Sequence, residues 1–250
     1  MDEVSVWRRA WTYVVTTLAQ SLPNRCLLCH QTVIDGTGVC SLCLQRCLYC
    51  GPVCLGCGRS LVNDGAFCGA CRVLDALPVI APCSYHQGLG ASIAAIKYQG
   101  QFAALDVLCR ALMARVTQLK EEGEIPPVSL LLPVPLHPKR LKTRGFNQAY
   151  EIALSLSKLS GIPLCDDLLQ RRRDTQPQAG LTGKARRKNL LGAFELTGNC
   201  HQGSVALVDD VVTTGSTANE IAAMLQHQGV RVQVWCLARA EAPGLLDTFG

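Results

Sequence analysis

Aromatic and charged residues are both scarce in this chain of 250 residues. Aromatic side chains make up 5% of the sequence and Asp, Glu, Lys and Arg together 17%, whereas 48% of the residues are apolar. This composition excludes a disordered, collagen-like or coiled-coil protein. It favours an α/β sheet covered by helices over an aromatic-rich β-sandwich.

Long apolar runs are also lacking. No stretch approaches the roughly 18 apolar residues that a membrane helix requires, and the N-terminus lacks the residue order of a secretory signal. We therefore expect a soluble, cytoplasmic protein. The net charge of +5 is mild for this length and by itself selects no partner.

Cysteine, by contrast, is abundant. Ten of the 15 cysteines lie between Cys26 and Cys71, and all ten belong to C-x-x-C pairs. Residues 26–43 and 54–71 align with an offset of 28 residues, which indicates an internal duplication. The aligned cysteines are Cys26, Cys29, Cys40 and Cys43 in the first repeat and Cys54, Cys57, Cys68 and Cys71 in the second.

Each repeat has the ligand spacing of a zinc ribbon. Two C-x-x-C knuckles joined by a short hairpin present four sulfur atoms in the tetrahedral arrangement that Zn²⁺ prefers. Four thiolates close the coordination shell, so we expect two structural zinc ions, which supply folding free energy to a segment too small to fold alone. A disulfide framework is the alternative, but it requires an oxidising compartment for which the chain shows no targeting signal.

The remaining cysteines fall into two groups. Cys47 and Cys50 form a fifth C-x-x-C pair, which is either spare or replaces one pair of a zinc site; the regular spacing favours the two repeats. The scattered cysteines lie in apolar surroundings and are expected in the core: Cys83, Cys109, Cys165, Cys200 and Cys236.

Changes of pattern along the chain predict three regions. Residues 1–25 carry apolar residues at helical spacing and predict an amphipathic helix, which either docks on the protein or lies on a membrane surface. Residues 26–75 are the predicted double zinc ribbon. Residues 76–250 alternate strand and helix patterns, which predicts a doubly wound, mostly parallel α/β sheet.

Apolar runs and helical periods give the elements expected in the third region. Strands are expected at 79–85, 128–134 and 205–208, and helices at 88–98 and 103–119. A further helix is expected from about Asn147, with Gly161 as its C-terminal stop. The continuous apolar run at 128–134 is typical of a parallel strand buried on both faces.

The residues after 205–208 predict a phosphate site. Two acids, Asp209 and Asp210, follow the strand, and the next helix is opened by Thr213, Thr214, Gly215, Ser216 and Thr217. At the carboxyl end of a parallel strand, unpaired amides and the helix dipole attract a phosphate. Thr217 and Glu220 also have capping-box spacing, which predicts a helix start near this point.

Asp209 and Asp210 are placed to accept hydrogen bonds from neighbouring hydroxyls of a sugar. An isolated Asp-Asp pair after a strand more often caps a helix, but the order of strand, acids, phosphate loop and helix favours diol binding. A phosphate and a diol side by side describe a ribose 5-phosphate. The loop matches neither the P-loop nor the dinucleotide-binding motif.

The run Val205–Thr217 resembles the phosphoribosyl pyrophosphate (PRPP) motif of type I phosphoribosyltransferases. Further features narrow the resemblance to the ComF/GntX family: the Cys-rich start at Cys26, Pro133–Arg140 with Arg144–Gln148, and Arg173–Gln178 with Arg187–Asn189. Together these motifs cover nearly the whole chain from Cys26. The resemblance implies the phosphoribosyltransferase fold preceded by a zinc-ribbon module.

The resemblance also implies a role for each part of the site. Asp209 and Asp210 would hold the ribose hydroxyls, and the loop from Thr213 to Thr217 would bind the 5-phosphate. Pyrophosphate, which binds with Mg²⁺, would contact Arg140 and Arg144. Arg173 belongs to a stretch, 171–189, that would close over the sugar and neutralise the leaving group. The implied catalytic residues are thus Asp209, Asp210, Arg144 and Arg173, although any single arginine of the stretch more often faces water.

Two functions remain open at this stage. One is an enzyme that displaces pyrophosphate from Mg²⁺-PRPP. Purine-specific relatives carry an acid where this chain has Thr213, so the acceptor would need no base or would use one from another residue. The other is a sensor or scaffold that keeps the PRPP pocket and holds single-stranded DNA or a DNA-uptake protein, which the family's association with competence favours.

Overall fold

A computed structural model describes residues 25–33, 38–62, 65–90, 93–94, 102–173 and 192–241. The predicted N-terminal helix, most of the predicted 88–98 helix and most of the 171–189 stretch lie outside these ranges. In the described part of the chain, no helix is long and apolar enough to cross a bilayer.

Contacts divide the chain into two compact units, residues 1–46 and 47–250. The first zinc-ribbon repeat belongs to the first unit, and the second repeat shares the second unit with the sheet. The boundary expected near residue 75 therefore marks a change of sequence pattern within a compact unit, and its standing as a domain boundary stays a prediction.

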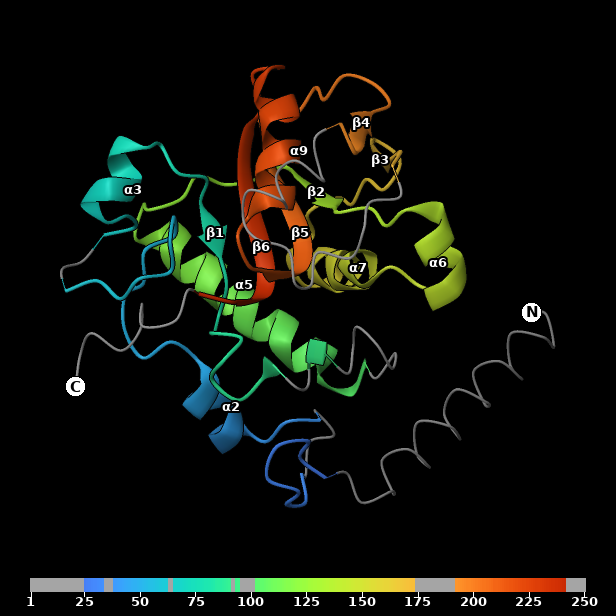
Figure 1. The fold of residues 1–250 in the computed structure, drawn as a ribbon. Coiled ribbons are helices and arrows are strands. Elements are labelled where there is room, and N and C mark those ends of the chain that lie inside the picture. Colours follow the sequence, from blue (N-terminus) through green and yellow to red (C-terminus); the bar gives the residue numbers. More distant parts are fainter. Residues whose placement is uncertain are drawn as a thin grey trace, which may run out of the picture. The chain divides into compact units, whose positions relative to one another are not determined.

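Four parallel strands form the central sheet of the second unit (Figure 1). Their order across the sheet is β1 (Val79–Ile80), β6 (Arg231–Arg239), β5 (Ser204–Val212) and β2 (Leu130–Pro133). The middle strands are buried along nearly their whole length, as expected of parallel strands in a sheet that is covered on both faces.

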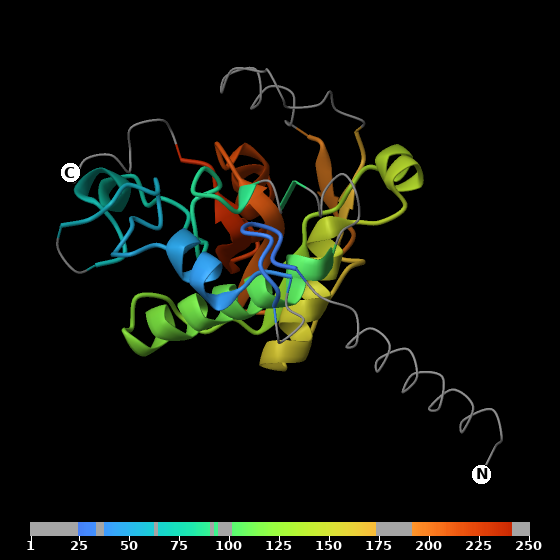
Figure 2. The same ribbon diagram turned by 90° about the horizontal axis from the view of Figure 1, so that it is seen from below.

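Helices cover both faces of this sheet. α5 (Leu105–Glu121), which follows the short 3₁₀ helix η1 (Phe102–Ala104), packs on β6 and on α7 (Gln148–Ser160), and α7 packs on β5 and β2. The helix α9 (Ser216–Gln226) packs on β6 from the other face. Figure 2 shows α5 in green and α7 in yellow on one side of the strands and α9 in orange-red on the other. The doubly wound α/β architecture is confirmed.

The ends of α7 are those that its sequence predicts. The Asn147 side chain caps the first turn by accepting from the Ala149 amide at 3.2 Å. Gly161 ends the helix in the left-handed conformation with a φ of 73°, which only glycine adopts without strain.

Two strands differ in length from their predictions. β1 covers only Val79–Ile80 because Pro82 has no amide to donate, and parallel pairing with β6 resumes at the bridge between Ser84 and Arg239. β5 continues past Val208 to Val212, so Asp209 and Asp210 lie inside the strand and not after it.

Arg239, the last residue of β6, connects the second zinc ribbon to the sheet through hydrogen bonds. Its Nη1 donates to the Leu55 carbonyl at 2.8 Å and its Nη2 donates to the Gly56 carbonyl. The Leu55 carbonyl also accepts from the Val79 amide at 2.9 Å. A buried cation thus holds a ribbon knuckle against the start of β1.

We expect Arg239→Met to lower the free energy of unfolding of the second unit by about 2–3 kcal/mol, because two carbonyls lose a charged donor. Urea unfolding measures the change. Arg231→Met, at the exposed start of the same strand, is the matched control and should stay within about 0.5 kcal/mol of the wild type. Equal losses from both substitutions would contradict the role of Arg239.

Candidate functional site

Two sets of four cysteines are brought together as the repeats predict. In each set the sulfur atoms lie within 4.8 Å of one another. The Sγ atoms of Cys29 and Cys40 are 3.8 Å apart, as are those of Cys57 and Cys68. A zinc tetrahedron with Zn–S bonds of about 2.3 Å has edges of about this length, so both sets fit structural zinc.

The duplication also holds for the backbone. The amide of the third cysteine donates to the sulfur of the first in both repeats: Cys40 to Cys26 at 3.3 Å and Cys68 to Cys54 at 3.2 Å. The residue after the second cysteine has a positive φ in both, 60° at His30 and 80° at Gly58. Each repeat ends in a short helix, α2 (Ser41–Cys47) or α3 (Gly69–Val73). The two ribbons are therefore copies of one structural unit.

The other cysteines stand apart from these sets. Within the described ranges, neither Cys47 nor Cys50 belongs to a four-cysteine cluster. Burial raises the pKa of the Cys83 thiol to about 12 and that of Cys109 to about 11, which keeps both neutral in the core. Cys200 and Cys236 are buried as expected. Cys165 is a correction, since it is only half-buried and its thiol donates to Asp167 at 3.0 Å.

The sheet opens a crevice between the carboxyl ends of β5 and β2. The two strands are neighbours, yet the chain leaves β2 toward α7 on one face and leaves β5 toward α9 on the other. Such a switch point is where open α/β sheets bind ligands. A cavity of about 870 Å³ lies here, lined by residues that follow all four strands of the sheet.

Asp209 and Asp210 both line this cavity at the end of β5. Asp209 is half-buried and Asp210 is 5% exposed. Each carboxylate accepts from the next amide, Asp209 from Asp210 and Asp210 from Val211, both at 2.8 Å. Successive strand residues point to opposite sides, so the cavity extends around the end of the strand and reaches both acids.

The predicted phosphate loop lies beside the two acids. All five residues from Thr213 to Thr217 line the cavity. Gly215 is the N-cap of α9 with a φ of 69°, a conformation that strains any residue with a Cβ. The Thr214 and Ser216 hydroxyls are hydrogen-bonded to each other at 2.8 Å. Hydroxyl donors and the first turn of an eleven-residue helix therefore face one space.

The helix start predicted near Thr217 is confirmed, because α9 begins at Ser216. The capping box itself is wrong, since the N-cap residue is Gly215 and no side chain of that residue bonds to the first turn. Glu220 instead accepts from the Gly192 amide at 2.9 Å. Glycine at the cap position brings no side-chain oxygen to the helix end.

A short basic helix forms the β2 side of the cavity. α6 (Pro138–Arg144) starts with a proline after the His137 N-cap and ends at Gly145, which has a φ of 84°. Arg140 and Arg144 lie one turn apart on the same face, and both line the cavity together with Lys139. The segment that contains this helix is held at both ends, because the Asn147 Nδ2 after the helix donates to the Val134 carbonyl before it at 3.1 Å.

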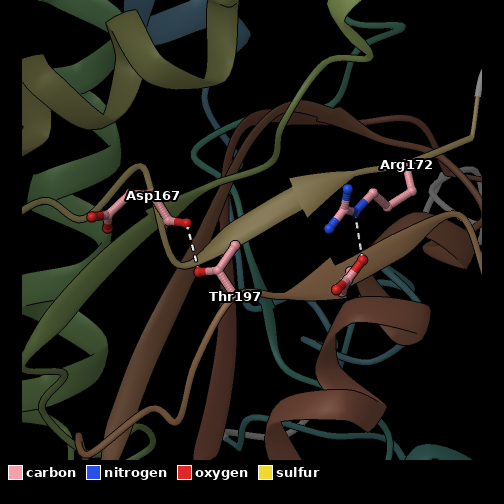
Figure 3. A network of polar contacts seen from close by, with 4 residues as sticks. Asp167, Arg172 and Thr197 are labelled. Carbon is pink, nitrogen blue, oxygen red and sulfur yellow. Dashed lines mark hydrogen bonds and ion pairs between the residues drawn. The ribbon is translucent and has the colours of Figure 1, made fainter.

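The arginines of the 171–173 run point in different directions. Arg171 lies in the antiparallel pair of β3 (Leu169–Arg171) and β4 (Phe194–Leu196). Its side chain is 9% exposed and lines the cavity, and its Cζ atom lies 5.4 Å from the centroid of the Phe194 ring. Arg172 pairs with Glu195 across the hairpin, beside the bond from Thr197 to the Asp167 carbonyl (Figure 3). Arg173, one of the four predicted catalytic residues, is exposed and does not line the cavity.

The described lining combines four cations with two carboxylates: Lys139, Arg140, Arg144 and Arg171 against Asp209 and Asp210. This balance suits a ligand that carries several negative charges and also has hydroxyls to donate. Sequence reasoning missed two further lining residues, Tyr85 and His86. Their only signal is their place just after the first strand, at the same edge of the sheet as the phosphate loop.

The parallel sheet, the crevice and the paired cysteine sets define a doubly wound α/β protein that carries a double zinc ribbon. Residues 17–72 match the double zinc ribbon domain family. A solved structure, the purine phosphoribosyltransferase from Pyrococcus horikoshii, covers 54% of this chain and 72% of its own with 18% identity. Its TM-score of 0.32 is too low to bear on fold or function.

Curated relatives match nearly end to end. Competence protein F from Haemophilus influenzae is 37% identical over 86% of this chain and 97% of its own. The DNA utilization protein YhgH from Escherichia coli K12 is 31% identical over 88% of this chain and 98% of its own. Competence protein ComFC from Streptococcus pneumoniae is 26% identical over 86% of this chain and 100% of its own. The chain belongs to the ComF/GntX family.

We expect two zinc ions per chain after reducing, chelator-free purification, measured by inductively coupled plasma mass spectrometry. Cys26→Ser and Cys54→Ser should each reduce the content to about one. Only Cys54→Ser should also lower the unfolding temperature of the second unit, because that ribbon is bonded to the sheet through Arg239. Cys50→Ser is the control and should keep both ions; a zinc-free wild type would contradict the assignment.

Proposed function

We propose that the cavity binds Mg²⁺-PRPP and that the protein serves DNA uptake or utilisation in the cytoplasm. One observation carries the ligand assignment: two diol-accepting carboxylates, a hydroxyl-rich helix N-terminus and a row of cations line one cavity. PRPP carries a matching set of groups, since its vicinal hydroxyls lie between a phosphate and a pyrophosphate.

The protein groups are suited to the parts of this ligand in a definite order. Asp209 and Asp210 would accept from the ribose hydroxyls, and the loop from Thr213 to Thr217 would bind the 5-phosphate. The cations of α6 and Arg171 would lie along the pyrophosphate. Arg173 is exposed and lies outside this lining, so its part in binding the leaving group stays a prediction.

Mg²⁺ fits the same arrangement. It is commonly held by one or two carboxylates together with substrate phosphates, and Asp209 and Asp210 are the carboxylates of the described lining. Bound with PRPP, the ion would supply positive charge to the pyrophosphate. The protein's own cations would then complete the neutralisation and orient the ligand.

The biological role rests on the relatives. Proteins named for competence and for DNA utilisation match this chain over nearly their whole length. PRPP binding would then make the work of this protein on incoming DNA depend on the state of nucleotide metabolism. A phosphoribosyl transfer in the same cavity is the second candidate. The cavity is also lined by residues that have no assigned contact with PRPP, such as Tyr85 and His86, and this favours a second substrate.

We expect Asp209→Asn/Asp210→Asn to weaken PRPP binding by at least about tenfold in calorimetry with Mg²⁺, because hydrogen bonds to charged groups contribute about 1.5–3 kcal/mol each. Inorganic pyrophosphate measured without Mg²⁺ has neither a diol nor a metal for these carboxylates to hold, so its binding should not weaken in the variant. Asp166→Asn/Asp167→Asn changes an exposed Asp-Asp pair outside the cavity and should leave both affinities unchanged. Tighter PRPP binding by the cavity variant would contradict diol recognition.

Single-stranded DNA is the proposed partner of the 171–189 stretch, which includes Arg186 and Arg187. We expect the logarithm of the DNA association constant to fall linearly with the logarithm of the salt concentration, with a slope of about −0.7 for each phosphate contact. The double substitution Arg186→Gln/Arg187→Gln should make this slope shallower. Fluorescence anisotropy over a salt series measures this. Lys120→Gln, on the exposed last turn of α5, is the control. A flat salt response of the wild type would leave a protein partner as the DNA-uptake contact.

A further inference from the structure

The end of β6 carries two buried charges that lie outside the cavity lining. Among the residues that the structure describes, four charged side chains are buried, and two of them, Arg171 and Asp210, line the cavity. The other two, Arg239 and Glu241, do not line it and are 8% and 6% exposed. Burying a charge costs free energy unless hydrogen bonds compensate it. The partners of these two side chains therefore show what the end of β6 depends on.

The Arg239 guanidinium contacts the second ribbon inside a metal-binding knuckle. The two carbonyls that accept from it, those of Leu55 and Gly56, lie between Cys54 and Cys57 in the chain. These two cysteines belong to the second four-cysteine set. The position of both carbonyls therefore depends on how the knuckle closes around its metal.

The two ribbons differ where the second one meets the end of β6. The second ribbon has Gly58, at which a Cβ would lie 2.7 Å from the Glu241 Cγ, whereas the first has the exposed His30 at the equivalent position. Leu55 is 2% exposed, and its counterpart Leu27 is 37% exposed. The duplicated units are thus alike around the metal, and the second one is fitted to the end of β6.

The backbone at the end of β6 contacts residues that line the cavity. The Arg239 carbonyl accepts from the Tyr85 amide at 2.7 Å, and the Ala240 amide donates to the Val212 carbonyl at 2.8 Å. Tyr85, Val212 and Ala240 all line the cavity. Val212 directly precedes the loop from Thr213 to Thr217. The same three-residue run thus contacts the ribbon through its side chains and the cavity through its backbone.

Glu241 adds a second path to the cavity. Its carboxylate accepts from the Tyr49 hydroxyl and, at 2.6 Å, from the Ser84 hydroxyl. The Ser84 oxygen in turn accepts from the His86 amide at 3.2 Å, and His86 lines the cavity.

We propose that the end of β6 couples zinc binding in the second ribbon to ligand binding in the cavity, with Arg239 and Glu241 as positioning residues. The proposal rests on the proposed PRPP site and adds the regulation of that site. While the knuckle is closed, its two carbonyls compensate the buried Arg239 charge. When the knuckle opens, the cation loses both acceptors and the end of β6 has to move toward water. The contacts with Tyr85 and Val212 then change with it, and the cavity loses its shape.

Such a coupling is reciprocal. If zinc in the second ribbon raises the affinity of the cavity for PRPP, PRPP raises the zinc affinity of that ribbon by the same factor. A residue that only adds stability changes neither affinity in the folded protein. The response of zinc affinity to PRPP therefore separates a coupling from a purely structural contact.

The test uses Cys26→Ser, in which the second ribbon is the intact four-cysteine set of the described residues. Its zinc affinity is measured by competition with a chromophoric chelator in the presence of Mg²⁺, with and without saturating PRPP. We expect PRPP to raise this affinity by about fivefold or more. Cys54→Ser is the matched control, because it reports the first ribbon, whose zinc affinity PRPP should leave unchanged.

Arg239→Met in the Cys26→Ser background should abolish the rise while the ribbon still holds its zinc. Circular dichroism verifies the fold. If this variant does not fold, Arg239→Lys replaces it, since lysine keeps the charge but lacks the planar fork that reaches two carbonyls, and the rise should shrink. Arg231→Met, at the exposed start of the same strand, should keep the full rise.

A full rise in the folded Arg239 variant, an equal rise in Cys54→Ser, or no rise in Cys26→Ser that binds PRPP would overturn the coupling alone. Failure of the PRPP site is a separate result, because the wild-type protein would then show no PRPP binding in calorimetry. That result would overturn the ligand assignment and this inference with it.

Discussion

The pairing of β5 with β2 on one side and β6 on the other is the constraint on which the site depends. Because all three strands are parallel, their carboxyl ends meet at one edge, and the segments that follow them converge there. The chain leaves β2 and β5 toward opposite faces, so the space between these segments stays open. This arrangement brings three groups to one space: the acids of β5, the N-terminus of α9 and the cations of α6.

Arg239 connects this edge of the sheet to the second metal centre. Its guanidinium holds the Leu55 and Gly56 carbonyls of the ribbon, and its backbone carbonyl accepts from Tyr85 at the wall of the cavity. Two residues on, the buried Glu241 accepts from the hydroxyls of Tyr49 and Ser84. Zinc bound to the second ribbon would thus stabilise the segment around Tyr85, whereas the first ribbon belongs to the other compact unit.

Much of the site was accessible from the sequence because its residues are contiguous. Asp209 through Thr217 form one strand, turn and helix start, and Arg140 and Arg144 are one helical turn apart, so spacing alone predicts their neighbourhood. Arg171 and Arg173 show where this fails. Both belong to one basic run, but only Arg171 lies in the hairpin strand with its side chain buried against Phe194, while Arg173 is exposed beyond the strand. The packing of the hairpin separates them, and no local pattern encodes it.

The sequence by itself determined the two cysteine sets and the alternation of strands and helices, because thiolate spacing and apolar period are local properties. Only the tertiary structure decided that Tyr85 and His86 share a cavity with Asp209, and that the second ribbon is bonded to the sheet. These contacts join residues more than 100 positions apart in the chain, and they depend on the order of the strands, which is set by how the helices pack on both faces of the sheet.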